Sequence, residues 1–92
     1  MPQVFKIGSY WVYFWTNEGK PMEPVHVHIA LGAPAMNATK VWITRAGKTY
    51  LCHNNSNIPE RALRNMMKII EARSGEVLSK WREYFGEATF FC

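Results

Sequence analysis

The stretch Val25-His26-Val27-His28-Ile29 alternates β-branched residues with histidines, and this alternation predicts a β-strand. Because successive side chains of a strand point to opposite faces, the three aliphatic residues share one face of a sheet and the two histidines share the other. Histidine is the side chain that titrates near neutral pH, so two imidazoles together on a non-core face mark that face as the candidate functional one.

Four other segments have strand character and surround the histidine strand. They are rich in β-branched or aromatic residues and are bounded by Gly, Pro, Asn or Ser. Besides residues 25–31, the predicted strands are residues 4–7, 10–15, 39–44 and 48–52. Gly8-Ser9 fits a tight hairpin turn between the first two of them. Within residues 10–15, alternation places the even-numbered side chains on one face and the odd-numbered ones on the other.

The chain then changes to helical periodicity. Asn57 is predicted to cap a helix, with Glu60 in the capping-box position. Apolar residues from Leu63 to Tyr84 stay in phase across Gly75. This favours one long helix, with a kink at Gly75 left open, over two helices that turn back on each other. Gly86 fits the C-terminal cap. The sequence therefore predicts an α+β fold, an antiparallel meander of about five strands with one long helix on one face.

Length and composition indicate a single domain of ordinary globular type. The chain has 92 residues, of which 48% are hydrophobic and 20% are charged. We expect one domain over residues 1–92, with the sheet in residues 3–52, the helix in residues 58–85 and a short apolar tail in residues 87–92. No apolar run approaches the ~20 residues that span a bilayer, and the N-terminus lacks the apolar stretch of a signal peptide. We therefore expect a cytoplasmic protein that does not act at a membrane.

The net charge of +4 is unevenly distributed. Residues 1–58 hold five cations and two anions, whereas residues 59–92 hold six cations and five anions. A mild basic excess on the sheet half permits binding to nucleic acid or to an acidic partner. Cys52 and Cys92 have no metal-ligand spacing, so we expect both to be free thiols and predict no zinc site built on them.

The side of the sheet that carries the two histidines, here called the histidine face, is predicted to be the one that the helix leaves uncovered. Strand alternation could bring a lysine, a tryptophan and one aromatic row of residues 10–15 onto this face. Two glutamates in the loop before the histidine strand are its expected neighbours. An exposed face of this kind is typical of a binding surface. Its predicted residues are His26, His28, Glu18, Glu23, Lys40 and Trp42.

Two kinds of catalysis are also compatible with His26 and His28. The pair could ligate a divalent metal ion, with a third ligand from Glu18, Glu23 or His53. Without metal, the imidazoles and a lysine could act as acid, base and phosphate clamp. However, the pair matches no recognised ligand spacing, and adjacent imidazoles are too close together to act on opposite sides of a phosphate. We therefore predict no cofactor and favour no enzymatic activity, and we keep a His-dependent nuclease or metal-dependent hydrolase as the alternative.

Nucleic-acid binding has two further candidate elements. Arg61, Arg64 and Lys68 share a helix face, but glutamates are interleaved with them and no helix-turn-helix companion is visible. This pattern is typical of a solvated amphipathic helix. The tryptophans of the predicted sheet could stack on bases, but tryptophan is usually buried, so a place in the core or in a dimer interface is favoured.

Three motifs together resemble a known family. They are residues 17–29, Asn-Glu-Gly-Lys-Pro-Met-Glu-Pro-Val-His-Val-His-Ile, residues 38–43, Ala-Thr-Lys-Val-Trp-Ile, and residues 78–86, Leu-Ser-Lys-Trp-Arg-Glu-Tyr-Phe-Gly. With the start Pro-Gln-Val-Phe-Lys-Ile-Gly and the aromatic strand, they make the chain similar to the small bacterial "domain of unknown function 4160" family from about Val4 to Gly86. The family pattern usually has proline where this chain has Val25.

The resemblance implies an α+β domain in the bacterial cytoplasm. Such proteins are often encoded beside a second small domain and are candidates for parts of toxin–antitoxin-like or regulatory modules. No reaction or catalytic residue comes with the family, and fold likeness would not supply one. Our leading hypothesis is a binding and regulatory module that acts through a small, operon-encoded protein partner, with nucleic acid as a further candidate ligand. A homodimer through the histidine face or the apolar tail is also compatible with the sequence.

Overall fold

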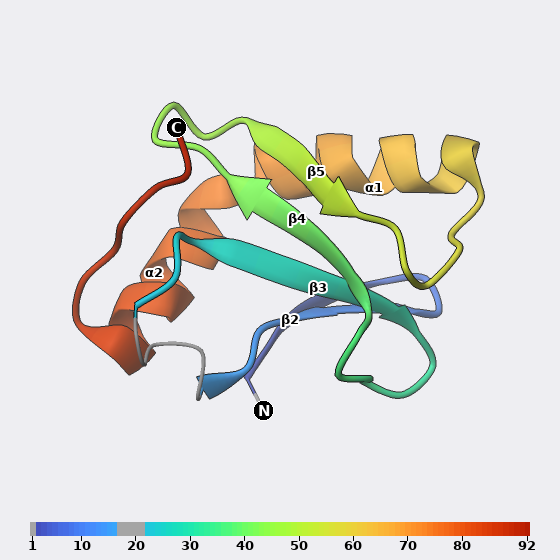
Figure 1. Ribbon diagram of the computed structural model, residues 1–92, viewed down its shortest axis with the longest axis horizontal. Coiled ribbons are helices and arrows are strands. Elements are labelled where there is room, and N and C mark those ends of the chain that lie inside the picture. The colour runs from blue at the N-terminus through green and yellow to red at the C-terminus, as the bar shows by residue number, and fades with distance from the viewer. Residues whose placement is uncertain (1, 17–21) are drawn as a thin grey trace.

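The computed structural model describes residues 2–16 and 22–92. Its strands are β1 (Gln3–Ile7), β2 (Tyr10–Tyr13), β3 (His26–Leu31), β4 (Thr39–Ile43) and β5 (Thr49–His53), and its helices are α1 (Glu60–Ala72) and α2 (Ser74–Phe85). The five strands form one antiparallel sheet in chain order, and both helices lie on the same side of it (Figure 1). The predicted meander is confirmed.

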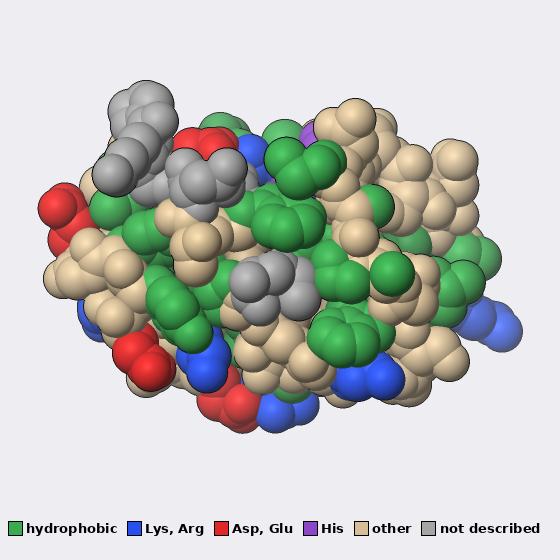
Figure 2. Space-filling view, turned by 90° about the horizontal axis from the view of Figure 1, so that it is seen from below, with side chains coloured by type: hydrophobic (Ala, Val, Ile, Leu, Met, Phe, Trp, Pro, Cys, Tyr) green, Lys and Arg blue, Asp and Glu red, His purple; other side chains and the backbone are tan. Residues whose placement is uncertain are grey.

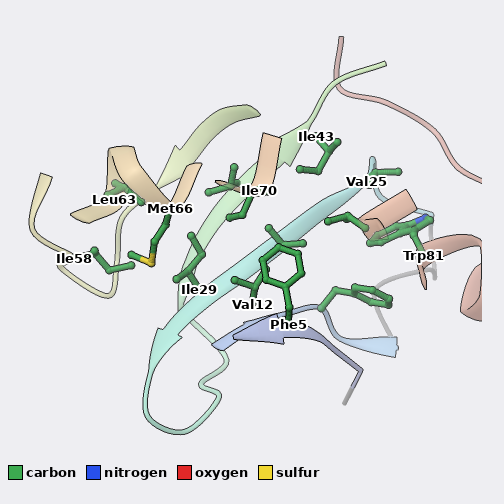
Figure 3. Close-up of a cluster of buried hydrophobic side chains, with 14 residues drawn as sticks. Phe5, Val12, Val25, Ile29, Ile43, Ile58, Leu63, Met66, Ile70 and Trp81 are labelled. Carbon is green, nitrogen blue, oxygen red and sulfur yellow. The ribbon is translucent and has the colours of Figure 1, made fainter. Parts of the chain in front are cut away.

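The core lies between the sheet and the two helices (Figure 3). The aliphatic side chains of the histidine strand face into it, and Val25, Val27 and Ile29 are fully buried. The helices cover them with one apolar stripe each, because residues three, four and seven apart share a helix face. These stripes comprise Leu63, Met66 and Ile70 of α1 and Val77 and Trp81 of α2.

The prediction of one long helix over residues 58–85 is wrong, because the chain leaves the helical conformation between α1 and α2. The break lies at Arg73, whose φ of −110° and ψ of 23° depart from helical values, and Gly75 lies inside α2. The Arg73 guanidinium lies 3.9 Å from the ring centroid of Phe5 in β1 and donates hydrogen bonds to Glu76. Contacts to the sheet and to α2 therefore hold the break in place.

The predicted helix start is also displaced. The N-cap of α1 is Pro59, which offers no side-chain cap, whereas Asn57 has a φ of 55° and lies in the preceding turn. The side chain of Asn54 stabilises this turn by accepting a hydrogen bond from the N–H of Ile58 and donating one to its carbonyl oxygen. Gly86 caps α2 with a left-handed φ of 78°, which confirms the predicted end of the helical region.

Residues 87–92 run back along the sheet beside the start of β3 and the end of β4 (Figure 1). The N–H of Val25 donates to the carbonyl oxygen of Thr89 over 2.8 Å, and the N–H of Arg45 donates to that of Cys92 over 2.9 Å. Phe91 is thereby brought onto the histidine face. The tail that the sequence describes only as apolar is a structural part of this face.

Candidate functional site

The structure confirms that His26 and His28 share the face opposite the aliphatic core. They lie on β3 with ring centroids 5.2 Å apart and ring planes at 90°. However, the expectation that this face is uncovered is wrong at the histidines, since His26 is 0% and His28 is 5% exposed. The pair is an internal feature of the fold.

Aromatic rings surround the two imidazoles. Tyr13 of β2 stacks on His28 at 5.7 Å, and Trp42 of β4 lies edge-on to His26 at 5.6 Å. Trp81 of α2 also lies edge-on to His26, with ring centroids 5.3 Å apart. The last contact joins the histidine pair to the helical layer, so the conformation of the site depends on the packing of α2.

One nitrogen of each imidazole is fixed by the main chain. The Nδ1 atom of His26 lies 2.9 Å from the carbonyl oxygen of Pro24, and that of His28 lies 3.2 Å from the carbonyl oxygen of Ala38. A carbonyl oxygen only accepts hydrogen bonds, so each Nδ1 carries a proton and donates it. This arrangement orients both rings and uses one nitrogen of each for structure.

Lys40 and Glu23 form the charged border of the face. The Lys40 ammonium lies 2.8 Å from a carboxylate oxygen of Glu23, and it also lies over the ring of Trp42, 4.5 Å from the centroid. The Lys40 side chain is only 15% exposed. The structure therefore brings together Glu23, Lys40, Trp42 and both histidines, whereas Glu18 lies outside the described residues.

A cross-strand row links three basic residues of the face. His28 of β3 is paired with Lys40 of β4, which is paired with His53 of β5. The pKa of His53 is lowered by burial first and then by the positive charges of His28 and Lys40. Within residues 2–16 and 22–92, no three His, Cys, Asp or Glu residues are grouped to hold a metal ion.

The outer part of the histidine face is an exposed aromatic patch, formed by Trp42, Tyr50 and Phe91. Phe91 stacks on Trp42 with centroids 5.3 Å apart and planes within 3°, and it contacts Tyr50 at 5.7 Å. Tyr50 is 57% exposed and Phe91 is 50% exposed. The aromatic row of residues 10–15 that strand alternation predicts on this face is the odd-numbered one, and its Tyr13 stacks on His28. Tyr50, Trp81 and Phe91 are not among the predicted residues of the site. Strand alternation could have placed Tyr50, but no local pattern links the other two to β3.

On the same face, Trp11 and Trp15 pack in a small second cluster with Tyr13, Ala30 and Ala38. Cys52 and Cys92 are exposed and form no disulfide, as the sequence predicts. In the part of the chain that the structure describes, neither helix is long and apolar enough to cross a membrane.

Comparison with protein-family models matches residues 9–82 to a domain of unknown function, DUF4160. The chain belongs to this family. Neither the curated proteins nor the solved structures include a significant match to it. The matched residues contain both histidines, Lys40, Trp42 and Trp81, but they end before Phe91. The aromatic patch is thus built from matched residues and from a tail outside the match.

Proposed function

We propose that this protein is a small bacterial binding and regulatory module that contacts a protein partner through the aromatic patch of Trp42, Tyr50 and Phe91. The observation that carries the proposal is the difference in exposure between the inner and outer side chains of the histidine face. The histidines are buried and oriented by main-chain carbonyls, whereas Tyr50 and Phe91 are half exposed or more. Aromatic side chains exposed beside a cation are typical anchors of protein interfaces.

The buried layer beneath the patch supports its use in binding. Trp42 makes an edge-on contact with His26, and the Lys40 ammonium, which is paired with Glu23, lies over its ring. A partner that covers the patch would therefore meet rings with few alternative conformations, and binding would cost little ordering entropy. The family resemblance suggests a partner encoded beside this chain, in a toxin–antitoxin-like pair acting in the cytoplasm.

Co-expression with the product of the adjoining gene tests the proposal. We expect a stable complex in size-exclusion chromatography with light scattering, and at least about tenfold weaker binding after Tyr50→Ser combined with Phe91→Ser, since buried aromatic anchors dominate interfaces. Tyr84→Ser is the matched control, because Tyr84 is equally exposed at 50% but lies on α2. A chain that forms no complex, or one that both variants weaken equally, would contradict the proposal.

Nucleic acid is the second ligand class for the same patch, because aromatic rings beside a lysine can stack bases and contact phosphate. A fluorescein-labelled single-stranded RNA measured at low salt tests it. Binding that disappears in the Tyr50→Ser and Phe91→Ser variant would assign RNA to the patch. Binding unchanged in that variant would place RNA elsewhere.

The row of His28, Lys40 and His53 favours one part of the alternative function, a His-dependent nuclease. His53 is partly exposed and its lowered pKa keeps a larger fraction of it neutral near pH 6–7, as a general base requires. Full biological effect in a folded His28→Ala and His53→Ala variant would exclude this alternative. Loss of effect together with RNA cleavage by the unaltered chain would replace the binding proposal.

A further inference from the structure

A second surface of the molecule lies away from the histidine face, where the β1–β2 turn meets α1. A shallow pocket of about 410 Å³ opens there, with a mostly apolar lining. Leu31, at the end of β3, stands at its edge and is 63% exposed, although β3 is otherwise buried. The lining includes Ile7, Tyr10, Leu31, Ala62, Asn65 and Met66. An exposed leucine beside an apolar hollow is a place for one large apolar side chain of a ligand.

The exposed side of α1 next to this pocket is basic. Arg61, Arg64 and Lys68 lie three and four residues apart, so they form a stripe along about two turns, or about 10 Å, of the helix. Arg64 pairs with Glu60, but both side chains are more than 70% exposed. Arg61 and Lys68 have no ion pair within the described residues. An exposed pair of this kind contributes little, so an external carboxylate can replace Glu60 at small cost.

The pocket and the basic stripe share a wall, because Asn65 lines both the apolar hollow and the depression between the cations. At the right-hand end of Figure 2, Lys or Arg side chains likewise stand beside hydrophobic ones. We propose that this composite surface, here called the α1 groove, binds an acidic peptide segment of a partner protein. One large apolar side chain of the segment fills the pocket, and its carboxylates pair with the α1 cations.

Charge complementarity and the apolar pocket together select this ligand. A nucleic-acid backbone would use the basic stripe but would leave the apolar pocket empty. An uncharged apolar peptide would use only the pocket. The α1 groove is separate from the aromatic patch, so this proposal adds a second contact surface and does not depend on the first.

Selection from a random 12-residue peptide library displayed on phage tests the α1 groove with the intact chain as bait. We expect enriched peptides to combine two or more Asp or Glu residues with a large apolar residue. A synthetic, fluorescein-labelled copy of an enriched peptide then serves as the probe in fluorescence anisotropy. Replacing its acids by amides, or its apolar residue by serine, should each weaken binding about tenfold.

Variants of the chain locate the binding site. Arg61→Glu with Lys68→Glu, and separately Leu31→Ser, should each weaken peptide binding about tenfold. Lys80→Glu with Arg82→Glu on α2 makes the same change in net charge and should leave affinity unchanged. Circular dichroism checks that each variant is folded.

Several outcomes would overturn the proposal. They are enrichment of no peptide, enrichment of peptides without acids, or equal loss of binding in the α1 and α2 charge variants. A fourth is full binding by Leu31→Ser together with competition by single-stranded RNA, which would make the stripe a phosphate-binding surface. The Tyr50→Ser and Phe91→Ser variant should keep full peptide affinity, so failure of the aromatic-patch proposal is measured separately.

Discussion

Replacing Trp81 by alanine should destabilise the protein by about 3–5 kcal/mol, the usual cost of removing a large buried aromatic side chain. Trp81 is 0% exposed and lies where α2, β3 and the segment after β2 meet. Its ring centroid is 4.5 Å from that of Phe85, 5.1 Å from that of Phe14 and 5.3 Å from that of His26. The substitution therefore opens a cavity and removes the contact that joins α2 to the histidine pair.

The expected loss is large relative to the stability of the whole domain. A chain of 92 residues has a free energy of unfolding of about 5–14 kcal/mol by general per-residue values. At about 4–8 °C per kcal/mol, the midpoint of thermal unfolding should fall by about 12–40 °C. Urea unfolding followed by circular dichroism gives the free energy directly, and temperature scans give the midpoint.

Trp81→Phe is the matched control for this prediction. The buried indole N–H of Trp81 has no hydrogen-bond partner within the described residues, so phenylalanine removes an unpaired polar group while it keeps most of the ring. Its cost should stay below about 1.5 kcal/mol, because the lost area and the removed unpaired donor offset each other. A loss below about 1.5 kcal/mol in Trp81→Ala, or equal losses in the two variants, would refute the packing described here.

Three further predictions concern the backbone and the charged groups. Gly86→Ala should lower the free energy of unfolding by about 1–2 kcal/mol, because φ is 78° at this residue. Gly75→Ala, inside α2, should raise it by about 0.5 kcal/mol. The added methyl group meets no other atom within 4 Å at either position. The pKa of His53 is lowered in the folded chain, so the unfolded chain binds a proton at this residue more readily. His53 therefore does not affect the free energy of unfolding well above the unfolded pKa of about 6.5, and it lowers that free energy as the pH falls below this value. His53→Gln should therefore reduce the loss of stability between pH 7.5 and pH 5.5 in urea titrations. Glu23→Gln should cost less than about 1 kcal/mol in the same assay, because the partly exposed carboxylate is 36% accessible although Lys40 is mostly covered; a larger loss would show that the pair is well shielded from water.

The sheet could be predicted from the sequence because its signal is local. Alternation in Val25–Ile29 assigns the two faces of β3 before any contact is known, and the structure keeps that assignment. The Gly8-Ser9 turn likewise forms the β1–β2 hairpin, with Ile7 paired to Tyr10. Short connections favour neighbouring places for β1 and β2, for β3 and β4 and for β4 and β5, since antiparallel neighbours can be joined by a few residues, whereas twelve residues join β2 to β3.

The break between the two helices was missed because the spacing of the apolar residues is the same with and without it. Both helices turn an apolar stripe toward the same sheet. The buried residues Ile70 of α1 and Val77 of α2 therefore have the seven-residue spacing that one uninterrupted helix would also show. At the interruption, Arg73 contacts Phe5, which is distant in sequence. A pattern of apolar spacing carries no information about such a contact.

The burial of the histidines was missed for a related reason. Trp81 and Phe91 contact the histidine face from positions at least fifty residues beyond β3, and the main-chain hydrogen bonds of Val25 and Arg45 hold the tail there. Neither the helix phase nor the strand alternation predicts that these segments return to the same edge of the sheet. The residue types on the histidine face could be predicted from the sequence, whereas the burial of the histidines by Trp81 and the aromatic side chains around them could not.

This cover changes the role that the His-Val-His stretch can have. A group that reacts with a substrate needs access and a free choice of partner, but His26 and His28 are enclosed by rings, and each donates one hydrogen bond to the main chain. Instead, His26 makes edge-on contacts with Trp42 and with Trp81, and the second of these connects β3 to α2. A partner bound at Trp42 would therefore contact a ring that packs on His26, which in turn packs on Trp81 of α2. We expect partner binding and the packing of α2 to be energetically coupled through these contacts. Measuring the unfolding free energy of Trp81→Phe with and without the partner would detect this coupling, because the partner should stabilise the variant less than it stabilises the unaltered chain.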